Sequence, residues 1–212
     1  MPARPRPPAR RRRTAEEARQ RILEAAQKRL VEDGPDGLRL QELARDLGIS
    51  HPAILHHFGS REGLLTALAA HGVRGLNEEL ARRIREGPVD LREILDRTHA
   101  VLADRGQARL LAWLVLSGRR GTGEGPHVLA ELAEVAHAAR IARRDPAGGP
   151  APPYEDTVFT IVLVGLALFG DALAGDLIRT SAGVEGPGGA DRFRSWLAGL
   201  LEDHFSSDPA SY

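Results

Sequence analysis

The stretch that decides the fold is residues 38–68, LRLQELARDLGISHPAILHHFGSREGLLTAL, in a chain of 212 residues. Its apolar residues recur at helical spacing and predict two short helices, over 40–47 and 51–58. Gly48 permits the backbone conformation of a tight turn between them, and Ser50 is placed to cap the second helix. Two short helices joined by a tight glycine-containing turn are typical of the helix-turn-helix motif, which enters the major groove of DNA.

The apolar side chains of this segment predict a small core between the two helices. Ala44 is small enough to let the helices cross closely, and Ile49 is placed to fill the angle between them. The opposite face of the helix over 51–58 is then free to enter a major groove. The other expected core residues are Leu43, Leu47, Ile54 and Phe58.

The rest of the chain is also predicted to be helical, because no segment shows the period-two alternation of a strand. Thr14 and Glu17 resemble a capping box that opens the first helix, and Gly34 is placed to end it. Ser60 is placed to cap a helix that reaches about residue 85. The fold class is therefore all-α. Further helices are expected over 90–104, 107–116, 126–144, 154–178 and 190–205.

The net charge of zero hides a basic front and an acidic back. Residues 1–61 carry 13 Arg or Lys against 8 Asp or Glu, which leaves 16 against 21 for residues 62–212. A basic front suits a polyanionic partner such as DNA. Residues 1–13 hold six of these arginines and are rich in proline, so we expect a disordered basic arm. Such an arm either reaches the DNA or is an inert extension.

Composition also bears on location. The chain has no cysteine, which excludes disulfides, thiolate metal sites and cysteine nucleophiles. No apolar segment follows the basic start, as a secretory signal would require. The uncharged stretch over 157–170 is shorter than the roughly 20 residues of a membrane-spanning helix, so we expect a buried helix there. These features indicate a cytoplasmic protein without a membrane partner, associated with the nucleoid when bound to DNA.

The sequence contains no nucleophile elbow, no phosphate-binding loop and no His-Glu-x-x-His zinc motif. The glycine-rich run over 121–125 follows a predicted helix rather than a strand, so we expect a loop. His56 and His57 point about 100° apart on a helix and cannot chelate one metal well. His127 and His137 could share a helix face, but no third ligand accompanies them. We therefore expect no enzyme activity, no cofactor and no metal.

The segment from Ile22 to Leu65 resembles the N-terminal domain of the TetR family of bacterial repressors. In the family this motif ends with the pattern aromatic-x-x-Phe, followed by Ser-Lys-Glu-x-Leu. Here it is LHHFGSREGL over 55–64. The resemblance covers about 45 of the 212 residues, and the C-terminal part matches only in length and helical character.

This resemblance implies a DNA interface. The start of the recognition helix and Gln41 would face base edges, while the two adjacent histidines lie where the family contacts phosphates or the groove. Arg61 replaces the family's phosphate-binding lysine and keeps its charge. The residues expected to contact DNA are Arg39, Gln41, Ser50, His51, Pro52, Ala53, Leu55, His56, His57 and Arg61.

Two residues depart from the family pattern. Leu55 stands where most members have a tyrosine whose hydroxyl reaches a phosphate, so one hydrogen bond of about 0.5–1.5 kcal/mol is lost. Arg39 precedes the second helix, where the family favours a Ser or Thr cap, and loss of that cap costs about 0.5–2 kcal/mol. Arg39 could offset this loss by binding a phosphate directly.

The resemblance also implies dimerisation and effector binding. A protein that reads a short palindrome needs two recognition helices about 34–36 Å apart. In the family the last two helices of each subunit form a four-helix bundle, which corresponds to 154–178 and 190–205 here. Only 4% of the residues are aromatic, so the pocket should be mainly aliphatic and suit a small apolar or amphipathic effector. The expected effector contacts are His99, Arg109, Trp113 and Phe159.

The sequence thus predicts three parts: the basic arm over 1–13, a helix-turn-helix domain over 14–60 and a helical effector-binding and dimerisation domain over 61–212. The implied function is a homodimeric repressor that a small molecule releases from a palindromic operator in double-stranded DNA. Two alternatives stay open. One is a helical small-molecule-binding or enzymatic protein with a vestigial helix-turn-helix, and the other is an architectural DNA binder that uses the arginine arm. Activation by the effector, or regulation without one, is also open.

Overall fold

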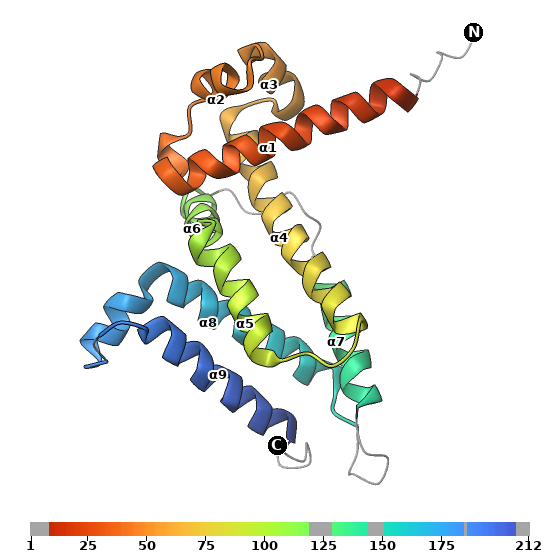
Figure 1. Ribbon diagram of the computed structural model, residues 1–212, viewed down its shortest axis with the longest axis vertical. Coiled ribbons are helices and arrows are strands. Elements are labelled where there is room, and N and C mark those ends of the chain that lie inside the picture. The colour runs from red at the N-terminus through yellow and green to blue at the C-terminus, as the bar shows by residue number, and fades with distance from the viewer. Residues whose placement is uncertain (1–8, 119–128, 144–150, 185, 207–212) are drawn as a thin grey trace.

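Residues 9–118, 129–143, 151–184 and 186–206 are described by a computed structural model of the chain (Figure 1). Every regular element within these ranges is a helix, so the all-α fold class is confirmed. One element, η1, is a π-helical turn that continues α5. The elements are α1 (Ala9–Gly37), α2 (Leu40–Leu47), α3 (His51–Phe58), α4 (Arg61–Arg85), α5 (Leu91–His99), η1 (Ala100–Asp104), α6 (Gln107–Leu116), α7 (Ala130–Ala142), α8 (Tyr154–Ser181) and α9 (Gly189–Ser206).

The first helix begins earlier than the capping box predicts. α1 starts at Ala9, so Thr14 lies inside the helix and does not cap it. The reason is that residues 9–13 are alanine and arginine, which favour helix, and the last proline of the basic arm is Pro8. Residues 9–13 of the predicted arm belong to α1, residues 1–8 lie outside the described ranges, and the disorder of the arm stays a prediction. The predicted break at Gly34 is confirmed, because its φ of 69° kinks α1 there.

The predicted bounds of α2, α3, α4 and α6 are confirmed because local signals fix them. Gly48 has a φ of 64° and ends α2 in the left-handed conformation. The hydroxyl of Ser50 accepts a hydrogen bond from the amide of Ala53 (3.3 Å). The hydroxyl of Ser60 accepts one from the amide of Gly63 (2.9 Å). Both serines therefore cap their helices as expected.

The N-terminal core is formed by more than the first three helices. Leu43 and Ile54, from the two helices of the motif, are fully buried. The same cluster includes Leu64 and Leu68 of α4 and Leu110 of α6, so the core extends past residue 60 into the C-terminal part of the chain. The helix-turn-helix is therefore packed directly on α4 and α6.

Among the C-terminal helices, α7 packs against the far end of α4 (Figure 1). α4 runs from the helix-turn-helix to α7, and α5 packs against both α8 and α9. The helix predicted over 90–104 is divided into α5 and η1. The helix predicted over 126–144 is α7, which is shorter, and residues 126–128 of that prediction lie outside the described ranges.

α8 is not the buried helix that its composition predicts. Within the single chain only Thr157, Leu168 and Gly175 of this helix are buried. By length and composition alone α8 could cross a membrane, a property that some helices of soluble proteins share. The prediction is wrong for the isolated chain because an apolar helix can be covered by a second chain as well as by its own.

Candidate nucleic-acid interface and buried cavity

The recognition helix α3 is held in place from its inner side. Ile54 is buried against α2 and α4, and the guanidinium of Arg19 lies 5.0 Å from the ring centroid of Phe58. The outer side carries Pro52 and His56, both exposed. The arrangement therefore leaves the outer surface of α3 open to a partner, as a helix that reads a major groove requires.

Three charged groups tie α2 to α1. Arg29 donates to Asp46 Oδ2 (2.7 Å) and to Glu42 Oε2 (2.8 Å). The hydrogen bond that Arg29 donates to Asp46 is the largest of the effects that raise the pKa of Arg29 above its usual range. Because Arg29 neutralises two carboxylates of α2, it also reduces their repulsion toward a nearby phosphate.

Most residues expected to contact DNA lie on one surface around α2 and α3. Arg39 precedes α2, its side chain is 73% exposed, and it makes no side-chain cap for the helix. The absence of a cap at this position was predicted and is confirmed. The other exposed members are Gln41, Ser50, Pro52 and His56, and the half-buried ones are His51, Ala53, Leu55 and His57.

Arg61, expected to contact a phosphate, is engaged with the backbone between α1 and α2. Its Nε donates to the carbonyl of Leu38 (2.8 Å), and its Nη2 donates to the carbonyl of Pro35. The guanidinium also lies 5.7 Å from the ring centroid of Trp113. Arg61 thus supports the connection between α1 and α2 through two of its donors, and its contact with a phosphate stays a prediction.

Trp113 joins the helix-turn-helix to the C-terminal part. Its indole Nε1 donates to Asp36 Oδ1 (2.9 Å) while Arg61 lies over its ring. Trp113 belongs to α6, and two leucines of the same helix, Leu110 and Leu114, belong to the N-terminal core. One face of α6 is therefore part of the junction between the two domains.

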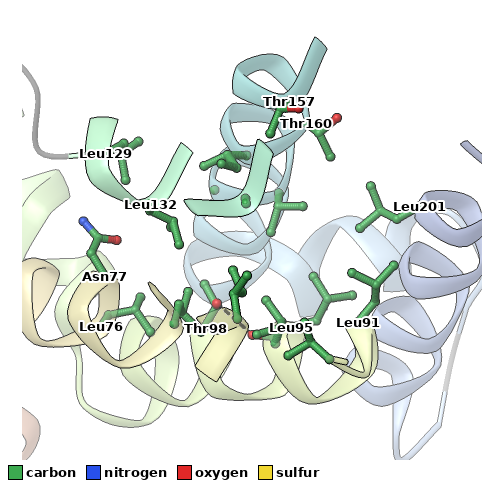
Figure 2. Close-up of a pocket in the computed structure, with 18 of the residues that line it drawn as sticks. Leu76, Asn77, Leu91, Leu95, Thr98, Leu129, Leu132, Thr157, Thr160 and Leu201 are labelled. Carbon is green, nitrogen blue, oxygen red and sulfur yellow. Dashed lines mark hydrogen bonds between the residues drawn. The ribbon is translucent and has the colours of Figure 1, made fainter. Parts of the chain in front are cut away.

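A large cavity lies among helices α4 to α9 (Figure 2). Its volume is about 1400 Å³. The walls are mainly leucine, isoleucine and valine, with threonines at separate places. The labelled lining residues in Figure 2 are Leu76, Asn77, Leu91, Leu95, Thr98, Leu129, Leu132, Thr157, Thr160 and Leu201.

A charged cluster lies at the end of the cavity formed by α7, the start of α8 and the end of α9. Arg140 lines the cavity, donates to Asp156 and lies 4.8 Å from the ring centroid of Phe205. His204 Nε2 lies 3.1 Å from Asp156 Oδ1. Burial alone would raise the pKa of Asp156, but its contacts with Arg140 and His204 outweigh burial and lower that pKa below its usual value. The carboxylate is thus ionised and neutralised by its neighbours.

None of the four residues expected to contact an effector lines this cavity. Trp113 is at the domain junction, and the guanidinium of Arg109 lies beside Gly34. His99 faces Asp171, with 3.6 Å between Nε2 and Oδ2. Phe159 is 62% exposed on the outside of α8. The spacing of apolar residues along a helix does not determine which side of the helix faces the cavity. These four side chains lie on other sides of their helices.

None of the polar residues in the cavity wall was predicted from the sequence, and Gln107 is the most buried of them. Gln107, the first residue of α6, lines the cavity and is only 1% exposed. The signal in the sequence is weak: a single amide at the start of the apolar segment 107–116, after Gly106.

α8 and α9 present a broad apolar surface to solvent. On α8 the exposed apolar residues form two groups, over 159–166 and 173–177, which together span about 27 Å of helix at 1.5 Å per residue. Leu177 is 73% exposed, and Trp196 on α9 is 62% exposed. The remaining exposed large apolar residues on the two helices are Tyr154, Val162, Leu163, Leu166, Leu173, Ile178, Leu200 and Phe205.

Within the described ranges, no three His, Asp or Glu side chains gather as a metal site would require. The rings of His56 and His57 are 5.7 Å apart and nearly perpendicular. His127 and the glycine-rich run over 121–125 lie outside the described residues.

The comparison with known sequences concerns the N-terminal part. Residues 22–68 match the family model described as bacterial regulatory proteins, tetR family. Over 52 residues the chain is 44% identical to the HTH-type transcriptional repressor AcnR of Corynebacterium glutamicum. The matched segment covers 24% of this chain and 28% of that repressor. The chain thus matches little more than a quarter of the length of this curated relative.

Solved structures extend the likeness to most of the chain. A TetR-family transcriptional regulator from Pectobacterium atrosepticum has a TM-score of 0.62 and 20% identity, over 91% of this chain and 94% of that chain. A TetR variant from Acinetobacter baumannii AYE, in complex with minocycline, has a TM-score of 0.57 and 23% identity, over 88% of this chain and 97% of that chain. At these identities the likeness establishes the fold.

The structure combines a packed helix-turn-helix with a larger helical part that surrounds a cavity, and this all-α fold is the one it shares with the solved structures. Residues 22–68 thus resemble the tetR family of bacterial regulatory proteins, and the fold of most of the chain resembles that of the solved regulators.

Proposed function

We propose that the protein is a homodimeric transcriptional repressor without enzymatic activity. It acts in the cytoplasm, binds a palindromic operator in double-stranded DNA through α2 and α3, and is released by a small apolar or amphipathic effector. The observation that carries this proposal is the recognition helix, which is capped by Ser50, anchored by Ile54 and open to solvent on its outer side. The identity to a transcriptional repressor over this segment supports the same role.

The proposed DNA contacts divide into two kinds. Base readout is assigned to Gln41 and to the first turn of α3, whose residues are His51, Pro52 and Ala53, because an N-terminal turn in the major groove reaches base edges. Phosphate contacts are assigned to the exposed Arg39 and to the polar groups around α3, with Leu55 in an apolar contact. The phosphate-contact residues other than Arg39 are Ser50, His56 and His57. Arg61 is assigned a positioning role, because its donors are engaged with the connection between α1 and α2.

The proposed dimer uses the apolar surface of α8 and α9. A row of exposed apolar residues along about five turns of α8 is more than a soluble monomer usually leaves uncovered. Pairing of these helices across a two-fold axis buries the row and sets the distance between the two recognition helices. The four-helix arrangement is thus the proposed reason for the exposure of Leu177 and Trp196.

The proposed release mechanism runs through α4 and α6. Both helices belong to the N-terminal core, through Leu68 and Leu110, and both also line the cavity, through Leu76 and Leu111. A ligand that favours a different position of these helices changes the distance between the DNA-binding domains. A shift from 1:99 to 99:1 requires about 5.5 kcal/mol of differential affinity. The minocycline complex of a protein with the same fold supports a small-molecule effector.

Selection of bound sequences from a library of randomised DNA duplexes tests this function. A repressor of this kind is expected to enrich one palindrome with half-sites about 10–10.5 base pairs apart, or a multiple of that spacing. The variant Gln41→Ala is expected to enrich a site that is less defined at one position of each half-site. Enrichment of no sequence would contradict the proposal and favour an architectural role or a vestigial motif.

A further inference from the structure

Arg140 differs from the other charged residues of the cavity wall. In the described part of the chain the lining holds four charged residues, of which Asp90, Arg143 and Glu202 are exposed to solvent. Arg140 is partly buried, with 16% of its side chain exposed. Water and salt screen an exposed charge strongly and a partly buried charge much less. Among these four charges, that of Arg140 therefore acts most strongly on an occupant of the cavity.

The guanidinium of Arg140 makes its hydrogen bonds through one nitrogen. Nη1 donates to Asp156 Oδ2 and to Thr157 Oγ1 (3.3 Å). Within the described ranges Nε and Nη2 make no hydrogen bond, and neither is one of the buried polar atoms that lack a partner, so both keep accessible surface. These two nitrogens form one edge of the planar guanidinium, and such an edge matches the two oxygens of a carboxylate.

The guanidinium of Arg140, and not only its aliphatic stem, lies at the cavity wall. Two of its contacts are Thr157 Oγ1 and the ring of Phe205, whose centroid is 4.8 Å away, and both residues line the cavity. In Figure 2, Thr157 lies beside Thr160 on α8, apart from Leu95. The cavity thus has a mainly aliphatic body and one end at which a guanidinium is accessible.

Asp156 does not occupy the edge formed by Nε and Nη2. One oxygen of its carboxylate, Oδ2, accepts from Nη1 of Arg140. The other, Oδ1, lies 3.1 Å from Nε2 of His204. The carboxylate is thus shared between two basic side chains, and the remaining edge of Arg140 is left for another anion.

Several donors elsewhere in the cavity wall are already used within the protein. The hydroxyls of Thr98, Thr160 and Ser206 donate to carbonyl groups of their own helices. Nε2 of Gln107 donates to a carbonyl group of α4 (2.6 Å). An occupant with a hydrogen-bond acceptor therefore finds donors at Arg140 that these residues do not offer.

We propose that the cavity takes an amphipathic molecule with an apolar chain and a carboxylate, and that Nε and Nη2 of Arg140 bind the two carboxylate oxygens. The inference rests on the proposed function of the cavity as an effector site and specifies the chemistry of the effector. The aliphatic walls favour the apolar chain, and a partly buried guanidinium edge favours an anionic head group. Because α7 packs on α4, the head group binds beside the helix that leads to the helix-turn-helix.

Decanoate and decan-1-ol test this inference, because they have carbon chains of equal length and differ in the head group. Their dissociation constants are measured by isothermal titration calorimetry for the full chain and for Arg140→Gln. The ratio of alcohol to carboxylate dissociation constants is expected to be about tenfold to a hundredfold higher in the unaltered chain than in the variant. A purely structural role of Arg140 beside Asp156 would change both dissociation constants together and leave the ratio unaltered.

Arg143→Gln is the matched control, because Arg143 is a second arginine of the cavity wall that is exposed and donates through Nη2 to the carbonyl of Gly87 (2.7 Å). It is expected to leave the ratio nearly unchanged. An equal ratio in the unaltered chain and in Arg140→Gln, or an equal loss in the two variants, overturns the assignment of Arg140. Failure of both probes to bind the unaltered chain overturns it as well, but contradicts the effector cavity itself, so the two failures are distinguishable.

A crystal structure of the unaltered chain with decanoate gives a test that does not depend on the variant being folded. The two carboxylate oxygens are expected about 2.7–2.9 Å from Nε and Nη2 of Arg140, with the carbon chain among the leucines of the wall. A carboxylate that projects into solvent, or that binds Arg143 instead, overturns the proposal.

Discussion

The N-terminal and C-terminal parts of the chain bury their apolar residues in different ways. The helix-turn-helix has a closed core in which Leu43, Ile54 and Leu64 are fully buried. The C-terminal part surrounds a cavity of about 1400 Å³ and leaves α8 largely uncovered. The first part is complete within one chain. The second has a cavity and an uncovered apolar surface, which under the proposed function take a ligand and a second chain.

Because of this difference, substitutions in the two parts are expected to have different effects. A substitution in the N-terminal core is expected to change stability directly, since close-packed side chains cannot fill a void without cost. A substitution on α8 or in the cavity is expected to change association or ligand binding while the single chain stays folded. The predictions below test that contrast, beginning with the largest expected effect.

Ile54→Ala is expected to remove about 2–5 kcal/mol from the stability of the N-terminal domain, because it leaves a cavity in a closed core. Sequence-specific DNA binding should then be lost, while α8 and α9 still associate. Thermal unfolding by circular dichroism and DNA binding by fluorescence anisotropy measure the two effects. His56→Ala, on the exposed side of the same helix, is the control and should leave stability unchanged. Equal stability of both variants would show that the motif is not a closed core.

Leu177→Glu combined with Trp196→Glu is expected to convert the dimer into a folded monomer. Both side chains are more than half exposed in the single chain, so charge there costs little until a second chain covers it. Loss of one of two linked recognition helices should weaken operator binding by about a hundredfold or more. Sedimentation velocity gives the oligomeric state. Thr180→Glu, on an exposed polar position of α8, is the control. A double variant that remains dimeric would place the interface elsewhere.

Gln41→Ala is expected to reduce discrimination at one base pair of each half-site by about 1–3 kcal/mol. Gln41 is exposed next to α3, so the substitution should leave the fold intact. Anisotropy titrations with operators altered at single positions measure the change. A uniform loss of affinity for all sequences would indicate that Gln41 binds a phosphate.

Arg39→Ala and Arg61→Ala are expected to have the smallest effects, and they differ in the salt dependence of DNA binding. Each phosphate contact contributes about 0.9 to the slope of log K against log salt concentration, so loss of Arg39 from both subunits should reduce the slope by about 1.8. Arg61→Ala should lower the affinity but leave the slope unchanged, because its guanidinium supports the carbonyls of Pro35 and Leu38. A reduced slope in Arg61→Ala would return this residue to the DNA interface.

The parts of the fold that the sequence predicts well are those fixed by local signals. Gly48 has the left-handed conformation, and Ser50 and Ser60 form the caps, so the bounds of α2, α3 and α4 follow from the residues themselves. The start of α1 does not, because alanine and arginine extend the helix beyond Thr14. Local residue preferences therefore determine both the bounds of α2, α3 and α4 and the early start of α1.

The parts that the sequence predicts poorly depend on tertiary packing. Which side of α6 faces the cavity decides that Gln107 lines it and Trp113 does not. The direction of Arg61 depends on carbonyl groups more than twenty residues away in the sequence. Helical periodicity shows that α8 is apolar. It cannot distinguish a helix buried in its own chain from one whose apolar residues are exposed, as most of those on α8 are.

The most direct test of the central claim is fluorescence anisotropy of the full chain with its selected palindrome and with a scrambled duplex of the same composition. At physiological salt a dimeric repressor is expected to bind the palindrome with two protomers per duplex and about a thousandfold or more tighter than the scrambled sequence. Equal affinity for the two duplexes would contradict sequence-specific DNA binding by the helix-turn-helix.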